Sequence, residues 1–133
     1  MNKSPLLQLK KIVKSYPQGN RQSLTVLKGC DLILRPGEVV GLLGVSGSGK
    51  SSLLHIAGFL DQPTEGEVLL EGVASKGQKD SVLTKWRNEK IGFIYQFHHL
   101  LPELTALENV MIPLLMRGRS WEVAKKVSEA YLK

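Results

Sequence analysis

The sequence predicts an α/β fold, and three features that follow one another along the chain carry this prediction. Residues 38–43 form a short and nearly all-apolar run, which is typical of a strand buried on both faces. A glycine-rich loop follows at residues 44–49. Residues 50–60 then place apolar side chains on almost every side of a helix, a pattern that favours a position in a core.

The residues before this unit are predicted to form strands. Residues 6–15 alternate irregularly between polar and apolar side chains and stop at Tyr16-Pro17. Residues 25–34 alternate weakly and stop at a Pro-Gly turn. Between the two strands, residues 18–23 have the composition of a loop.

The middle of the chain predicts three short elements. A turn at residues 61–66 leads into a brief strand at residues 67–71. Residues 80–87 have the pattern of a short helix that begins at an Asp-Ser cap. Residues 91–95 form a second apolar run and predict another buried strand.

The last third of the chain changes to helical spacing. Thr105 and Glu108 fit a capping box, and apolar residues between 104 and 115 recur at helical intervals, with Pro113 expected to kink or end that helix. A final helix is expected to begin near Ser120, with a common face formed by Trp121, Ala124, Ser128 and Tyr131.

The glycine loop predicts a nucleotide site. Residues 44–51, Gly-Val-Ser-Gly-Ser-Gly-Lys-Ser, match the pattern G-x-x-x-x-G-K-[ST], in which glycines let backbone N–H groups approach phosphate oxygens. Lys50 can reach the β- and γ-phosphates, and the Ser51 hydroxyl can ligate Mg²⁺. A Gly/Ser linker has similar composition but is not expected between a buried strand and a buried helix. We therefore expect ATP and Mg²⁺ as ligands of Gly44, Val45, Ser46, Gly47, Ser48, Gly49, Lys50, Ser51 and Ser52.

Charge and composition limit the classes of partner. The 133 residues contain 18 Lys and Arg against 12 Asp and Glu, for a net charge of +6, but only Lys10-Lys11 and Lys125-Lys126 are adjacent basic pairs. Because nucleic-acid sites need clustered positive charge, a nucleic-acid partner is not expected. Cys30 is the single cysteine, and with no secretory apolar segment it favours a reducing compartment. The densest apolar run, residues 39–45, is far shorter than the roughly 20 residues that span a bilayer.

Three stretches resemble a known family. Residues 46–55 (Ser-Gly-Ser-Gly-Lys-Ser-Ser-Leu-Leu-His), 61–66 (Asp-Gln-Pro-Thr-Glu-Gly) and 91–110 are similar to the ATP-binding subunit of ABC transporters. Within the third stretch, Tyr-Gln-Phe-His-His-Leu-Leu-Pro at 95–102 most resembles the branch that contains the ATPase of lipoprotein-releasing systems, together with macrolide-exporter and cell-division ATPases. The resemblance covers essentially the whole chain.

The resemblance implies a partial P-loop NTPase fold of the ABC ATPase type. Residues 1–133 would form the N-terminal part of a single nucleotide-binding domain. An antiparallel β-subdomain and the P-loop core would occupy about residues 1–95. The Q-loop and the start of the helical subdomain would occupy about residues 96–133.

The resemblance also implies roles for individual residues. Tyr16 stands where the family has an aromatic residue that stacks on adenine; the alternative is a tyrosine that only packs at a strand end. Gln96 matches the Q-loop glutamine, which contacts Mg²⁺ or the attacking water, so Lys50 and Gln96 are the expected catalytic residues and Ser51 and Gln96 the expected Mg²⁺ ligands. A groove for a helix of the membrane subunit would be lined by Phe97, His98, His99, Leu100 and Leu101, with ordinary core packing as the alternative.

The implied activity is that of an ATPase that couples ATP binding and hydrolysis to the release of lipoproteins from the inner membrane. Its partners would be transmembrane subunits and a second ATPase copy, without nucleic acid. It would lie peripherally on the cytoplasmic face of the bacterial inner membrane and reach the bilayer only through those subunits.

The family's signature loop, its apolar strand ending in Asp-Glu and its switch histidine are not found in these 133 residues. We therefore expect the N-terminal part of a longer ATPase, which holds nucleotide but hydrolyses little by itself. Two alternatives remain: a truncated nucleotide-binding module without turnover, and the ATPase of a related exporter. A nucleic-acid-associated ATPase is a weaker third.

Overall fold

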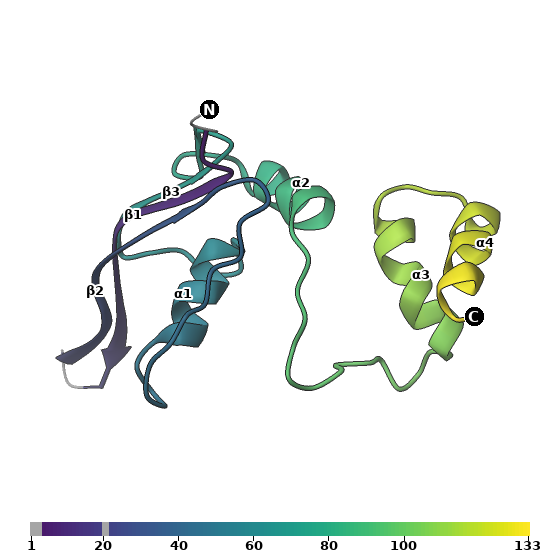
Figure 1. Ribbon diagram of the computed structural model, residues 1–133. Coiled ribbons are helices and arrows are strands. Elements are labelled where there is room, and N and C mark those ends of the chain that lie inside the picture. Colours follow the sequence, from purple (N-terminus) through teal and green to yellow (C-terminus); the bar gives the residue numbers. More distant parts are fainter. Residues whose placement is uncertain (1–3, 20–21) are drawn as a thin grey trace. The chain divides into compact units, whose positions relative to one another are not determined.

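The computed structural model describes residues 4–19 and 22–133, so Asn20 and Arg21 of the predicted loop lie outside the described residues. The chain divides into two compact units, Met1–Leu83 and Thr84–Lys133. Figure 1 shows the strands and the first helix in the first unit and a pair of helices at the end of the second. Each unit has its own buried residues.

The first unit is built on an antiparallel sheet. Its four strands are β1 (Leu7–Gln18), β2 (Gln22–Leu34), β3 (Glu65–Leu70) and β4 (Val73–Ala74). They lie in the order β2-β1-β3-β4, so β1 is hydrogen-bonded on both sides along part of its length. The predicted strands in residues 6–34 and 67–71 are confirmed, with small shifts of their ends.

The first strand runs further than predicted. Tyr16 pairs with Leu24 and Pro17 with Ser23, so the strand does not stop before the Tyr-Pro dipeptide. The pairing of β1 with β3 ends at Val13, which leaves that side of Pro17 without a strand. Proline is tolerated at such a position because its missing N–H removes no bond from the sheet.

Helix α1 (Lys50–Ala57) contacts β1 and β2 (Figure 1). Leu53, Ile56 and the following Phe59 are buried, together with the sheet residues Leu9, Ile12, Leu27 and Val68. The prediction that residues 50–60 are buried on every side is wrong, since Leu54 is 56% exposed and Leu60 45%. Within the first unit, only the face of the helix that carries Leu53 and Ile56 is buried.

Two predicted strands do not form among the described residues. Residues 38–43 are without regular structure, with Val39 96% exposed and Leu43 93%. Residues 91–95 are also irregular, and Ile94 is fully exposed. A strand needs a hydrogen-bonded neighbour, and no strand in the described part of the chain pairs with either segment. Both apolar runs therefore remain outside a sheet.

The second unit contains a helical pair. Helix α2 (Asp80–Lys90) crosses the boundary between the units and confirms the predicted helix at residues 80–87. Helices α3 (Ala106–Met116) and α4 (Trp121–Tyr131) pack side by side (Figure 1), with Met111 and Ala124 buried.

The predicted caps and faces of this pair are largely confirmed. Thr105 and Glu108 form a complete capping box, and Ser120 caps α4. Helix α3 continues past Pro113 to Met116, so the proline does not end it. On the predicted face of α4, Ala124 and Ser128 are buried, whereas Trp121 and Tyr131 are mostly exposed.

Candidate functional site

The glycine loop ends where α1 begins. Gly49 is the N-cap of α1 and has a φ of 90°, which an L side chain rarely adopts. A Cβ at this position would lie 2.9 Å from Leu27 Cδ2 and 3.0 Å from the carbonyl O of Val26. The absence of a side chain thus lets the loop pack directly on β2, and this packing fixes the direction in which α1 starts.

Lys50 folds back over the loop. Its ammonium group donates hydrogen bonds of 2.7 Å to the carbonyl oxygens of Gly44 and Val45. Ser48 N–H donates to the same Val45 carbonyl over 3.3 Å, which closes the turn. A lysine ammonium group has three N–H donors, so one donor remains for an anion placed in the loop.

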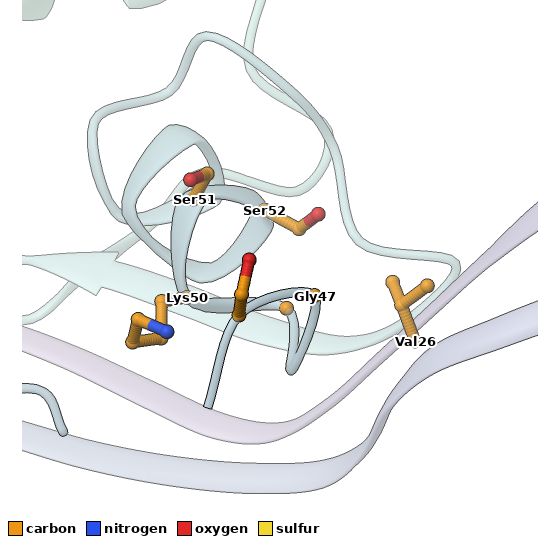
Figure 2. Close-up of a pocket in the computed structure, with 7 residues that line it drawn as sticks. Val26, Gly47, Lys50, Ser51 and Ser52 are labelled. Carbon is orange, nitrogen blue, oxygen red and sulfur yellow. The ribbon is translucent and has the colours of Figure 1, made fainter. Parts of the chain in front are cut away.

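A cavity of about 370 Å³ lies at the start of α1. Figure 2 shows Lys50, Ser51 and Ser52 at the start of the helix, with Gly47 in the loop before it and Val26 on a neighbouring strand. The complete lining consists of Val26, Ser46, Gly47, Gly49, Lys50, Ser51 and Ser52. A positive charge and several hydroxyl groups therefore face one small volume.

The first turn of α1 adds backbone donors to this cavity. The first N–H groups of any helix have no intrahelical partner, and they carry the positive end of the helix dipole. At α1 no side chain caps them. These donors, the Lys50 ammonium group and the glycine-lined turn fit a polyphosphate, and the Ser51 hydroxyl is an oxygen ligand of the kind that Mg²⁺ prefers. The predicted ligands from Gly44 to Ser52 thus lie together in one segment.

Tyr16 is joined to this site through Ser52. Its hydroxyl lies 3.3 Å from Ser52 Oγ and 3.2 Å from Asp61 Oδ2, within hydrogen-bond distance of both. The residue as a whole is 37% exposed. The side chain of Lys14 places its ammonium group 5.0 Å from the ring centroid. The predicted adenine-stacking residue is therefore fixed next to a residue that lines the cavity.

Asp61 accepts several hydrogen bonds at the turn after α1. Lys14 Nζ donates to Oδ1 over 2.6 Å, and the Gln62 N–H donates to the same oxygen over 2.7 Å. Partial burial opposes ionisation of the carboxyl group, but the hydrogen bonds from Lys14, Gln62 and Tyr16 and the charge of Lys14 outweigh it and lower the pKa of Asp61. Sequence reasoning missed the roles of Lys14 and Asp61, which lie 47 residues apart.

Gln96 and the docking residues lie in the second unit. Gln96 is exposed in the irregular segment after residue 95, and its placement relative to the glycine loop stays a prediction. Of the docking residues, Phe97 is 69% exposed, Leu100 55% and Leu101 48%. His98 Nδ1 accepts the N–H of Leu100 over 3.4 Å, and the His99 ring meets that of Tyr95 edge-on. These apolar side chains are thus largely exposed among the described residues, and their docking role stays a prediction.

Asn109 on α3 holds the end of this segment. Its side-chain oxygen accepts the N–H of Leu101 over 2.8 Å, and its amide nitrogen donates to the carbonyl oxygens of Leu101, Leu104 and Thr105. Sequence reasoning missed this residue, although the adjacent capping box indicated a structured helix start.

Comparisons with known proteins identify similar chains. The family model for the ABC transporter matches residues 27–133. The lipoprotein-releasing system ATP-binding protein LolD of Roseobacter denitrificans is 50% identical over 117 residues, which are 88% of this chain and 52% of that protein. The LolD protein of Alcanivorax borkumensis is 46% identical over 134 residues, 95% of this chain and 58% of that protein. The chain spans about half the length of these curated relatives.

Solved structures show the same fold. An ATP-binding cassette in a dimeric post-hydrolysis state with ADP and Pi has a TM-score of 0.84 at 42% identity, over 93% of this chain and 54% of that one. A dimeric bacterial ABC transporter cassette has a TM-score of 0.82 at 44% identity, over 90% and 53%. The predicted partial fold of the ABC ATPase type is thereby confirmed. Because the family match spans most of the sequence and the relatives share close to half of their aligned residues, this chain belongs to the ABC transporter family.

Proposed function

We propose that this chain binds MgATP through the glycine loop, as the nucleotide-binding part of an ABC transporter ATPase that releases lipoproteins from the inner membrane. The cavity at the start of α1, with Lys50 and the helix N-terminus beside it, is the observation that carries the nucleotide part of the proposal. The proposed cargo rests on the similarity of this chain to ATP-binding proteins of lipoprotein-releasing systems.

The proposal assigns a role to several loop residues and to two residues outside the loop. The glycines at 47 and 49 bring backbone N–H groups to the phosphate oxygens, and Lys50 directs its third N–H to the β- and γ-phosphates. Ser51 and Gln96 would hold Mg²⁺, which would supply positive charge to neutralise the phosphate oxygens. Lys50 and Gln96 are the catalytic residues that the proposal names, and Tyr16 stacks on adenine.

The proposal extends to partners and location. Phe97 to Leu101 would receive a helix of the transmembrane subunits, and a second copy of the ATPase would complete the pair, as in the dimeric cassettes of similar fold. The protein would lie peripherally at the cytoplasmic face of the bacterial inner membrane, without nucleic acid. Among the described residues no helix is long and apolar enough to cross a bilayer. Hydrolysis by these residues alone is expected to be weak.

The test of nucleotide binding is Lys50→Ala, measured by calorimetric titration with MgATP. We expect an affinity loss on the order of a hundredfold, because a charge-assisted hydrogen bond contributes about 1.5–3 kcal/mol. Lys11→Ala is the matched control, since Lys11 also pairs through its ammonium group, with Asp31, but lines no part of the cavity. Equal MgATP affinity in Lys50→Ala and the unmodified chain would contradict the assignment of the loop.

A further inference from the structure

The turn after α1 is attached to the end of β1 by a set of contacts that surround Tyr16. Asp61 accepts from Lys14 Nζ through Oδ1 and lies 3.2 Å from the Tyr16 hydroxyl through Oδ2. Lys14 Nζ also donates to the carbonyl O of Gln62 over 2.7 Å. One carboxylate therefore holds both the lysine and the tyrosine.

Hydrogen bonds of Thr64 fix this turn to the strand independently of Asp61. The Ser15 N–H donates to Thr64 Oγ1 over 3.0 Å, and the Thr64 N–H donates to the carbonyl O of Val13 over 2.8 Å. Removing the Asp61 carboxylate should therefore loosen the side chains of Lys14 and Tyr16, which keep only their contacts with Gln62 and Ser52, without detaching the turn. This separation makes the role of Asp61 testable.

The arrangement leaves Tyr16 with one occupied face. The ammonium group of Lys14 stands over the ring at 5.0 Å from its centroid, and the Lys14 side chain is only 12% exposed. An ammonium group held by two oxygen acceptors has little freedom to leave that face. Tyr16 as a whole is 37% exposed, and the ring face opposite the ammonium group is the one on which an aromatic ligand would stack.

We propose that Asp61 is a positioning residue for the nucleobase: with Lys14 it holds the Tyr16 ring so that a single face is presented to the purine. This inference rests on the proposed binding of MgATP and goes beyond it, because it names the residues that orient the base. Asp61 acts through Tyr16 and does not itself line the cavity at the start of α1. Asp61 should therefore affect the affinity for a nucleotide, which has a base, and leave the affinity for a polyphosphate, which has none, unchanged.

The experiment compares MgATP with Mg²⁺-tripolyphosphate as ligands of the full chain. In Asp61→Ala we expect the affinity for MgATP to fall by about two- to tenfold, the range that an aromatic stacking contact supplies, while the affinity for Mg²⁺-tripolyphosphate stays unchanged. Asp61→Asn keeps an oxygen for the Tyr16 hydroxyl and should recover most of the MgATP affinity. Asp31→Ala is the matched control, because Asp31 also accepts a 2.6 Å hydrogen bond from a lysine of β1 but is not in contact with Tyr16.

If Asp61→Ala folds poorly, a second variant can test the same inference. Tyr16→Phe keeps the ring and loses the hydroxyl that lies near Asp61 and Ser52, so it should show the same selective loss of MgATP affinity. Combining Asp61→Ala with Tyr16→Ala should add nothing to Tyr16→Ala alone. An equal loss for both ligands, or no loss for MgATP, would overturn the inference and leave the proposed function standing. Failure of the unmodified chain to bind either ligand would overturn both.

Discussion

Asp61 shows how a single side chain links stability to the site. Its carboxyl group connects the turn after α1 to Lys14 and Tyr16 of β1, and hydrogen bonds from these residues hold its pKa below the ordinary value of 3.8 despite partial burial. A carboxyl group whose pKa is lowered by folding stabilises the folded state above its unfolded pKa. That contribution disappears as the pH falls through the folded pKa.

The corresponding prediction concerns Asp61→Asn, measured by urea unfolding between pH 7 and pH 2. At pH 7 we expect the variant to be less stable by about 1 kcal/mol, because it loses the partly buried ion pair with Lys14. The difference in unfolding free energy from the unmodified chain should shrink as the pH falls below 3.8 and through the lower pKa of the folded carboxyl group. Once Asp61 is protonated it is neutral, as Asn is at every pH. A difference that stays constant over this pH range would show that the charge of Asp61 contributes nothing.

The site residues differ in how far the sequence could predict them. Lys50 and Ser51 could be predicted because their chemistry depends on a contiguous loop, and the structure places that loop at a cavity. Lys14 and Asp61 could not, because their pairing exists only once β1 and the turn after α1 have come together. A local sequence pattern carries no information about a contact between residues that lie 47 positions apart.

Among the elements, the strands that were predicted correctly are those with neighbours. β1 pairs with β2 on one side and with β3 on the other, so the polar and apolar side chains of these strands alternate between the two faces of a sheet. Residues 38–43 and 91–95 are more apolar than these strands, yet the described residues give them no partner and they remain irregular. Hydrophobicity predicts that a segment can be buried, but hydrogen-bond pairing decides whether it becomes a strand.

The close approach of β3 to β1 gives a prediction at this scale. A Cβ at Gly66 would lie 2.5 Å from the carbonyl O of Lys10 and closer still to that of Lys11, and both contacts are with backbone. Gly66→Ala should therefore destabilise the sheet by more than 3 kcal/mol, roughly the upper range of overpacking, or prevent folding. Gly72→Ala is the matched control, because Gly72 also has a positive φ but has open space around it. It should cost only about 1 kcal/mol of backbone strain.

Thermal unfolding monitored by circular dichroism distinguishes these glycine variants. The expected result is a much lower Tm for Gly66→Ala than for Gly72→Ala. Equal Tm values would mean that β1 can shift to admit a side chain. The irregular register of β1 near Lys11, which has a φ of 49°, would then be adaptable rather than fixed.

At the scale of the whole molecule, the proposed function requires a surface that binds the transmembrane subunits. The second unit exposes Phe97, Leu100 and Leu101 in one irregular segment, and Asn109 fixes the end of that segment to α3. Exposed apolar residues on a positioned segment are a feature of surfaces that bind a helix of a partner. The sequence predicted which residues form this segment, but only the structure shows that they are not packed in the core of their unit.

The final prediction tests this surface with Phe97→Asp. Truncation or charging of a central aromatic anchor costs about 2 kcal/mol or more, roughly thirtyfold in affinity, so co-purification with the transmembrane subunits should be lost. MgATP affinity should be unchanged, because Phe97 does not line the cavity at the start of α1 and is not among the proposed ligands of MgATP. Val73→Asp introduces the same charge at a β4 residue that is 49% exposed, and it should preserve the complex. If the complex survives in Phe97→Asp as well, the membrane subunits bind elsewhere on the chain, and the proposed docking residues are wrong even though the nucleotide site stands.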